Sequence, residues 1–176
     1  MKILVTGGGG FLGLSIVKQL LADKHEVTSL ARNHYTSLDE LAVKTLKCDL
    51  ADKEQIHNLD LTLFDGIIHT AAKAGVWGDK KDYFSINYTG TIDLFEKAKQ
   101  DKVKYFVYTS SPSVVFGKGD ICNEDENIEY PKKYYTDYAE SKAMAEKYIM
   151  DNLRDTIQFL SLLPQVIWVP IDRPLI

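Results

Sequence analysis

Two residues of the chain, Tyr138 and Lys142, have the types and the spacing of a proton-transfer pair. They lie four positions apart, so on a helix they would share one face. A phenol titrates at about pH 10 in water, and a neighbouring ammonium together with a positively charged ring held beside it lowers that pKa by favouring the phenolate. Tyr138 would then serve as an acid or a base near neutrality. The chain has 10 tyrosines, however, and this spacing alone also fits two residues of a surface helix.

Two further polar residues could hold or orient a reacting group. Ser111 follows a run of β-forming residues, and its hydroxyl could hydrogen-bond a carbonyl and steady it for hydride attack. Asn87 lies between apolar positions of a predicted helix, where asparagine is a poor helix former. It therefore either has a polar role, such as bonding a backbone carbonyl or a water near Lys142, or is a satisfied buried amide.

Glycines at three-residue spacing follow the first predicted strand. Gly7, Gly10 and Gly13 form the pattern G-x-x-G-x-x-G between that strand and the first helix. The first would provide the positive φ of a tight turn, the second would let a pyrophosphate approach the backbone, and the third would let helix and strand pack closely. The helix N-terminus, with Phe11 and Leu12, offers N–H groups to the phosphates. The alternative is a flexible glycine-rich turn.

The ends of the second and third predicted strands bear on which dinucleotide would bind. An acidic residue after the second strand would bind the 2′-hydroxyl of an adenosine ribose, but the sequence has Arg32 there. A guanidinium suits a 2′-phosphate, so we expect NADP(H) to be preferred and NAD(H) to remain possible. Arg32 could instead be a solvated surface cation. Asp49 and Leu50 close the third strand, where Asp49 would either accept a hydrogen bond from the adenine amino group or be an exposed turn residue.

The elements that must position these residues alternate between strands and helices. Apolar residues at three- and four-residue spacing predict helices, including one over Ile86–Gln100 and one over Tyr138–Asn152. The predicted strands are short, β-branched runs: Lys2–Thr6, Glu26–Ala31, Lys44–Cys48, Gly66–Thr70, Tyr105–Thr109 and Ile157–Leu162. Such alternation predicts an α/β fold, a doubly wound parallel sheet of the Rossmann type with helices on both faces. Residues 116–136 are predicted to form a long loop.

Composition and charge exclude several classes of protein. The 176 residues include 45% hydrophobic and 26% charged residues, which is typical of a globular domain with a core. The net charge of −4 gives no basic field for nucleic acid or an anionic membrane. The apolar stretch 159–171 is too short and too interrupted by prolines to span a bilayer. The two cysteines, Cys48 and Cys122, form no CxxC motif and indicate no metal site. With no signal peptide before the first strand, we expect a cytoplasmic protein.

Taken together, these motifs resemble the extended short-chain dehydrogenase/reductase family, in the same order and over nearly the whole chain. The resemblance implies an oxidoreductase with a Ser-Tyr-Lys triad made of Ser111, Tyr138 and Lys142, assisted by Asn87. It also implies reversible hydride transfer between a nicotinamide and a small-molecule substrate, in which Lys142 bonds the nicotinamide ribose. Ser111 is preferred to Ser110 because it precedes Val114 by three residues, as the serine of that family precedes a valine.

The resemblance also assigns cofactor contacts and a branch of the family. His69-Thr70-Ala71-Ala72, after the fourth strand, resembles the turn that supports the cofactor, so Ala71, Ala72 and the adjoining Lys73 are assigned to cofactor binding, and Pro164 fits a nicotinamide contact. Residues 71–78 and 108–116 look like the 3β-hydroxysteroid dehydrogenase branch, and especially like bacterial reductases of 2-alkyl-3-oxoalkanoates, with sterol-4-carboxylate 3-dehydrogenases as close relatives. An apolar 3-oxo acid or 3β-hydroxysteroid substrate is implied by this analogy.

The sequence departs from the pattern of the family near its end. Leu163 stands where the family has arginine, and Val169 and Ile171 stand where it has glycines. We therefore expect residues 1–176 to form a cofactor-binding domain whose C-terminal substrate domain is largely missing. Two alternatives stay open: a nucleotide-sugar epimerase or dehydratase of the same superfamily, and a non-catalytic NADP-binding module. A homodimer through the helices over 86–100 and 138–152 is possible.

Overall fold

The fold is taken from a computed structural model that describes residues 1–75, 77–117, 128–153 and 157–164. Its strands match the predicted ones to within a residue at each end: β1 (Lys2–Thr6), β2 (Glu26–Ala31), β3 (Lys44–Lys47), β4 (Gly66–His69), β5 (Tyr105–Thr109) and β6 (Gln158–Leu162). Some features singled out in the sequence lie outside the described residues: Val76, residues 118–127 of the predicted loop with Cys122, and both Val169 and Ile171.

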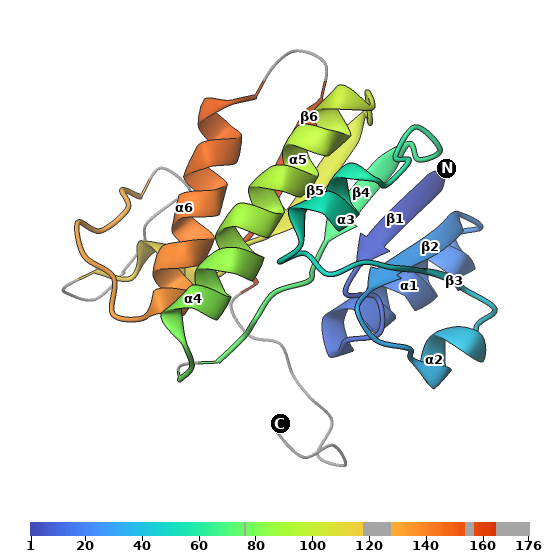
Figure 1. The fold of residues 1–176 in the computed structure, drawn as a ribbon, viewed down its shortest axis with the longest axis horizontal. Helices are drawn as coiled ribbons and strands as arrows, with labels where there is room; N and C mark the ends of the chain where they lie inside the picture. The colour runs from blue at the N-terminus through green and yellow to red at the C-terminus, as the bar shows by residue number, and fades with distance from the viewer. Residues whose placement is uncertain (76, 118–127, 154–156, 165–176) are drawn as a thin grey trace.

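All six strands form one parallel sheet in the order β3-β2-β1-β4-β5-β6 (Figure 1). The helical elements connect them: α1 (Phe11–Ala22), α2 (Thr36–Asp39), α3 (Lys53–His57), α4 (Lys80–Tyr83), the π-helix η1 (Phe84–Thr89), α5 (Gly90–Gln100), the 3₁₀ turn η2 (Pro112–Val115) and α6 (Asp137–Asp151). This strand order is that of a Rossmann fold, and the prediction of a doubly wound parallel sheet is confirmed.

The alternation of side chains along the strands divides the core between the two faces of the sheet. Ile3 and Val5 of β1 pack with α1 and with Leu38 of α2, whereas Leu4 points to the opposite face. That second face is covered by α3, α5 and α6, which lie together in Figure 1. Because both faces are covered, the central strands are continuous runs of apolar residues.

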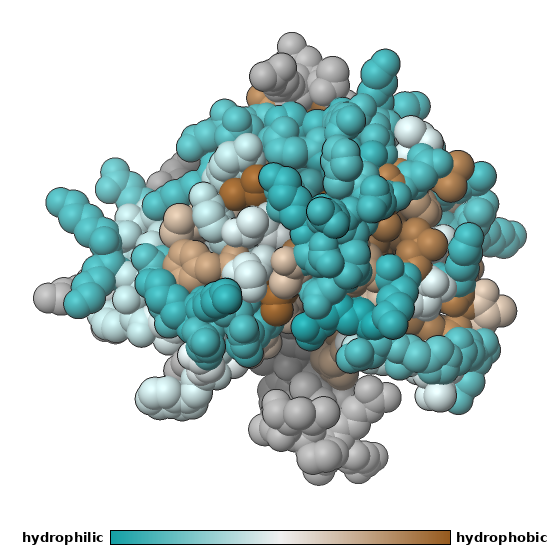
Figure 2. All heavy atoms as spheres, viewed as in Figure 1, coloured by the Kyte–Doolittle hydropathy of each residue, from teal (hydrophilic) through white to brown (hydrophobic). Residues whose placement is uncertain are grey.

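The outer surfaces of these helices are polar. Figure 2 shows the same side of the molecule as Figure 1, where hydrophilic side chains cover most of the helical layer and apolar ones show through in separate patches. In the described residues, no helix combines the length and the hydropathy needed to cross a membrane. The carboxyl ends of the six parallel strands meet at one edge of the sheet, which is where ligands bind in such folds.

Candidate functional site

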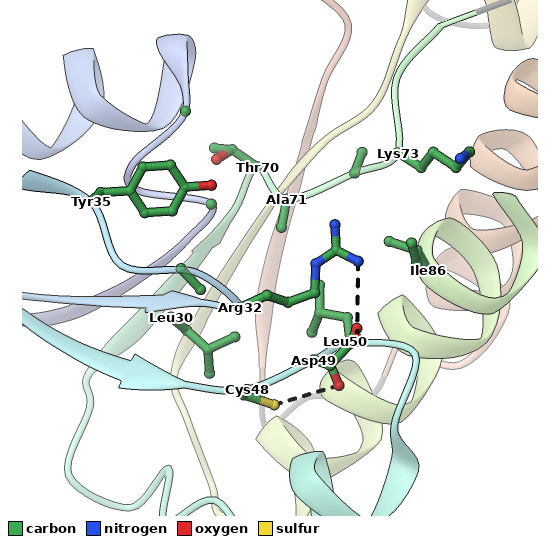
Figure 3. A pocket seen from close by; sticks show the side chains of 14 residues that line it. Leu30, Arg32, Tyr35, Cys48, Asp49, Leu50, Thr70, Ala71, Lys73 and Ile86 are labelled. Carbon is green, nitrogen blue, oxygen red and sulfur yellow. Dashed lines mark hydrogen bonds and ion pairs between the residues drawn. The ribbon is translucent and has the colours of Figure 1, made fainter. Parts of the chain in front are cut away.

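A cavity of about 210 Å³ opens at the carboxyl ends of the strands (Figure 3). Many of the residues that the sequence suggests for cofactor binding line it: Gly7, Gly10, Arg32, Asp49, Leu50, Ala71, Ala72 and Lys73. The lining also includes Thr70 of the predicted turn after β4, and residues that sequence reasoning missed: Leu30, Ala31, Tyr35, Cys48 and Ile86. Strand ends from β1 to β4 are therefore brought together around one space.

The glycine loop forms the floor of this cavity and has the predicted geometry. Gly7 has φ of +69°, which is the left-handed conformation that the tight turn requires. A Cβ at Gly13 would lie 2.1 Å from the Gly7 carbonyl oxygen, so the third glycine is needed for helix α1 to pack against the loop. At Gly10 an added Cβ would meet just this same oxygen, at 3.2 Å, and its other side is open to the cavity.

Helix α1 begins directly at the cavity. Gly10 is its N-cap and supplies no side-chain hydrogen bond, and the first turn has no acidic residue. The positive end of the helix dipole therefore faces the cavity without a neutralising carboxylate in that turn. Phe11, Leu12 and Gly13 form the first turn behind this surface and do not line the cavity themselves.

The side of the cavity formed by β2 and β3 contains an ion pair. The Arg32 guanidinium lies 4.0 Å from the Asp49 carboxylate, and both side chains are partly exposed. Figure 3 shows the two side chains directed toward each other across the strand ends. Arg32 thus lies at the edge of the cavity beside a carboxylate that partly offsets its charge, and more than half of its side chain is exposed to solvent.

An aromatic ring and a thiol complete this side. The Tyr35 ring covers Gly9 so closely that a Cβ there would lie 2.1 Å from the ring. Cys48 is buried, and burial together with the nearby Asp49 raises the pKa of its thiol to about 11. The thiol therefore stays protonated and unreactive at neutral pH, and it contributes to the cavity only as a lining side chain. The signal that could have indicated Tyr35 is its position in the loop just after β2.

A buried histidine connects the ends of β1 and β4. His69 Nδ1 lies 2.7 Å from Thr6 Oγ1, and its Nε2 lies 2.9 Å from Thr91 Oγ1. Burial, and then the charge of Lys142, lower the pKa of His69 to about 3, so the ring is neutral. The Thr6 hydroxyl also accepts the Ala71 backbone N–H at 3.1 Å. This network fixes the turn after β4 against the glycine loop.

Asn87 lies on the π-helix and is fully buried. Its Oδ1 accepts the Lys73 backbone N–H at 2.7 Å, and its Nδ2 donates to the Lys73 carbonyl at 3.0 Å and to Ser141 Oγ at 3.3 Å. The expected bond to a backbone carbonyl is present, although the carbonyl belongs to Lys73. Since Ser141 precedes Lys142, Asn87 links the cavity wall to α6.

Tyr138 and Lys142 both lie on α6, as predicted, and the lysine ammonium is held by residues of β5. Lys142 Nζ donates to the Thr109 carbonyl at 2.6 Å and lies 4.0 Å above the Tyr108 ring. Burial lowers the pKa of Lys142 to about 7, while the Glu146 carboxylate acts in the opposite direction. The local structure follows from Thr136, whose hydroxyl caps α6 by accepting the Ala139 N–H.

The pKa of Tyr138 depends on burial and on Ser111. Burial raises it, and a side-chain hydrogen-bonding interaction with Ser111 acts in the opposite direction. Lys142, whose ammonium bonds the Thr109 carbonyl, is not among the groups that shift this pKa, and the predicted lowering with a bound cofactor stays a prediction. Ser111 caps the 3₁₀ turn η2 through the Ser113 N–H, whereas Ser110 is buried and bonded to Glu146. Of the two serines, the structure therefore brings Ser111 to Tyr138.

The candidate catalytic residues do not line the cavity itself, and neither does Pro164, which follows β6. They are connected to it through Lys73, which lines the cavity with its backbone held by Asn87. Its side chain points away from the other residues in Figure 3 and pairs with Asp82 at 3.0 Å. In the residues described, no group of three or more metal-ligating side chains could hold a metal ion.

The sheet order, the glycine loop before α1 and the cavity at the strand ends define a Rossmann-type dinucleotide-binding domain. Residues 4–172 match the model of the 3-beta hydroxysteroid dehydrogenase/isomerase family, and the chain belongs to this family. The resemblance stated from the motifs is thereby confirmed.

Individual relatives agree with this family. A 2-alkyl-3-oxoalkanoate reductase of Shewanella oneidensis is 37% identical over 98% of this chain and 46% of its own length. A 3-beta-hydroxysteroid dehydrogenase of Mycolicibacterium neoaurum is 34% identical over 95% of this chain and 48% of its own length. The chain thus spans about half the length of these curated relatives. The solved UDP-glucose 4-epimerase of Thermus thermophilus, a complex with NAD, superposes with a TM-score of 0.80 at 29% identity, covering 93% of this chain and 54% of that one.

Proposed function

We propose that this chain is the nicotinamide-dinucleotide-binding part of an oxidoreductase that transfers a hydride between the cofactor and the carbonyl or hydroxyl group of an apolar substrate. The observation that carries the proposal is the connection between two sites. Asn87 holds the backbone of Lys73, a residue of the cavity wall, and also bonds Ser141 on the helix that presents Tyr138 and Lys142. This connection supports a dinucleotide site and an acid–base site that work as one unit.

The cavity fits a dinucleotide on its own chemistry. Glycine backbone forms its floor, so the phosphates could approach where a side chain would block them, and α1 directs the positive end of its dipole there. Leu50 and Ile86 give the apolar contacts that an adenine ring requires, and Arg32 with Asp49 could bond its ribose and base. Residues 1–176 would then serve as a cofactor-binding domain.

The reaction would use the chain's own acid, Tyr138. When bound, a nicotinamide supplies or takes up the hydride. In the reducing direction the Tyr138 hydroxyl donates its proton to the substrate oxygen as the alcohol forms, while the Ser111 hydroxyl holds that oxygen in place. The raised pKa of Tyr138 keeps the phenol protonated at neutral pH, which is the form this step needs. Lys142 would stabilise the phenolate left behind and bond the nicotinamide ribose.

Cofactor preference and substrate are finer parts of the same proposal. Arg32 would favour NADP(H), because its guanidinium at the cavity edge can bond a 2′-phosphate. The substrate would be a 3-oxo acid or a 3β-hydroxysteroid, as the names of the two curated relatives suggest. The cytoplasmic location and a homodimer through α5 and α6 belong to the same proposal.

A second candidate is a nucleotide-sugar epimerase, which is favoured by the structural similarity to the Thermus thermophilus enzyme. One experiment separates these candidates. The purified chain is titrated with NADPH and NADH, and then assayed with a 2-alkyl-3-oxoalkanoate and, separately, with UDP-glucose. Turnover of the keto acid supports the reductase, and turnover of UDP-glucose supports the epimerase. Cofactor binding without turnover of either indicates a binding module, and absence of any dinucleotide binding refutes the proposal.

A further inference from the structure

Glu146 is a buried carboxylate that the chemistry proposed above does not use. Glu146 is only 3% exposed to solvent, and it lies one helical turn after Lys142 on α6. A carboxylate in such a position is costly unless it is hydrogen-bonded or paired with a charge. Ser110 Oγ donates to its Oε2 at 2.8 Å, and Ser161 Oγ donates to its Oε1.

The hydrogen-bond partners of Glu146 come from separate parts of the fold. Ser110 follows β5 and immediately precedes Ser111. Ser161 lies on β6, where it pairs in register with Tyr108 of β5. Burial, and then the charge of Glu146, raise the pKa of the Tyr130 phenol in the segment before α6. The carboxylate therefore ties α6 to the end of β5 and to β6.

The Glu146 carboxylate also bears on the charge of Lys142. The ammonium is buried between the Thr109 carbonyl and the Tyr108 ring, where burial favours its neutral form and Glu146 favours the charged form. The charge of Lys142 also lowers the pKa of His69 on β4, whose ring is neutral.

Other titratable groups near α6 interact with residues other than Lys142. Tyr88 of η1 and the acidic residues of α5 act on Tyr148 instead. Lys80 of α4 pairs with Asp137 and Glu140 on the outer side of the helix, and η2 has no titratable residue. Among the described residues, Glu146 is thus the group whose charge favours the ammonium form of Lys142.

We propose that Glu146 is a positioning residue, whose buried carboxylate is the counter-charge of Lys142 one helical turn away and holds Ser110, and through it Ser111, against helix α6. The inference rests on the proposed function for its catalytic meaning, since Lys142 and Ser111 are assigned there. Its physical content is separate, because a buried counter-charge acts on Lys142 whether or not a substrate turns over. A merely structural glutamate would stabilise the fold without changing how Lys142 titrates.

The test follows the Lys142 side chain directly, by NMR of protein labelled with ¹³C at the lysine ε carbon, with Lys142→Arg used for assignment. In Glu146→Gln we expect the pKa of Lys142 to fall by about one pH unit relative to the wild type. Glu146→Asp keeps the charge and should restore most of the difference. Glu140→Gln removes the same charge from the outer side of the same helix and should leave Lys142 unchanged. An unchanged Lys142 titration in Glu146→Gln overturns the proposal.

Thermal unfolding from pH 6 to pH 9 supplies a second measurement, which also serves if Glu146→Gln is too unstable for NMR at neutral pH. Below its folded-state pKa, Lys142 would be a buried cation without its counter-charge, whereas above it the lysine is neutral in both proteins. The deficit in Tm of Glu146→Gln should therefore shrink as the pH rises. An equal deficit at both ends contradicts the proposal, because lost hydrogen bonds alone do not depend on the lysine charge.

These two measurements need no substrate, so their failure is distinguishable from failure of the proposed function. If the wild type turns over a keto acid, a third comparison applies. In the pH profile of kcat, the fall in activity at high pH should begin at a lower pH in Glu146→Gln than in the wild type. The KM for the dinucleotide should change little. A uniform loss of kcat at every pH would assign Glu146 a structural role alone and overturn the proposal.

Discussion

Asn87 and Lys73 are joined by a pair of hydrogen bonds, in which one carboxamide satisfies both the N–H and the carbonyl of the same residue. The carboxamide thereby makes the two hydrogen bonds that the backbone of a paired strand would otherwise make to Lys73. It comes from a π-helix, and π-helical turns occur frequently at functional sites. The segment after β4 is held in this way at the point where the cavity meets helix α6.

Replacing Asn87 by alanine should destabilise the fold. The change removes the bonds to Lys73 and Ser141 and leaves a buried N–H and carbonyl without these partners. We expect the free energy of unfolding to fall by about 2–4 kcal/mol, measured by urea denaturation. Asn58→Ala, at an exposed helix end, is the control and should change it by less than about 0.5 kcal/mol. Equal effects of the two changes would show that the Asn87 bonds do not stabilise the fold.

The glycines of the loop should respond differently to alanine. Gly13→Ala would place a methyl group 2.1 Å from the Gly7 carbonyl oxygen, and we expect a loss of about 3 kcal/mol or more in stability. Gly10→Ala meets the same oxygen at 3.2 Å and faces the cavity. This variant should keep its fold, measured by circular dichroism, yet bind a dinucleotide at least about tenfold more weakly. Unchanged dinucleotide affinity in Gly10→Ala would argue against phosphates at this loop.

Arg32→Ala tests the preference for NADP(H). Loss of a charge-assisted bond to a 2′-phosphate should weaken NADPH binding about tenfold or more and leave NADH binding nearly unchanged. Asp49→Asn should act in the opposite sense, because it removes the carboxylate that lies 4.0 Å from Arg32. Both affinities can be measured by the fluorescence of the reduced nicotinamide. Lys44→Ala, at the opposite end of β3, is the matched control, and an equal loss for both dinucleotides would rule out a 2′-phosphate contact.

Tyr138→Phe should abolish turnover while the cofactor still binds. The change removes the proposed proton donor and keeps the ring that packs edge-on against Tyr83. We expect kcat to fall by a factor of about 10² or more, with little change in dinucleotide affinity or in Tm. Tyr105→Phe removes an exposed phenol at the start of β5 and should retain full activity. Retained turnover in Tyr138→Phe would refute the role of this residue.

The buried His69 should make stability depend on pH in the acidic range. The unfolded chain takes up a proton on this residue below about pH 6.5, whereas the folded state resists it down to about pH 3. The unfolded state thus binds more protons in this window, and stability falls as the pH falls, by about 1.4 kcal/mol per pH unit from this group. His69→Gln should lower stability at pH 7 and flatten this slope. His57→Gln, at the exposed end of α3, should preserve it; an equally steep slope in His69→Gln would contradict the assignment.

The sequence was sufficient to predict most of the fold, for a physical reason. In a parallel sheet covered on both faces, the strands are short apolar runs and the helices between them carry an apolar stripe, so each element has a local signature. The positive φ of Gly7 and the close packing of Gly13 follow from the glycine spacing in the same way. The helical spacing does not indicate why residue 90 is a glycine: a Cβ at Gly90 would lie 2.2 Å from the Leu50 carbonyl oxygen.

The site was less predictable because its remaining parts depend on contacts between distant segments. The apolar positions Ile86, Gly90, Leu94 and Ala98 are spaced as in an α-helix, and nothing in that spacing indicates the π-helix that presents Asn87. Tyr35 covers Gly9 after a separation of more than twenty residues. Similarly, the direction of the Lys142 ammonium depends on the Thr109 carbonyl of another strand. Such features depend on contacts between residues far apart in the sequence, so no local sequence pattern indicates them.

The pairing of β1 with β4 has a consequence for how the protein is made. Their last residues, Thr6 and His69, are 63 positions apart, and β4 also has to pair with β5 farther along the chain. A ribosome therefore releases β1, α1 and β2 well before the strand that completes their sheet is available. We expect folding to be slow for a domain of this size, with the closing of this long loop as the rate-limiting event. The glycine loop would then reach its working shape late, when β4 docks and its histidine is buried.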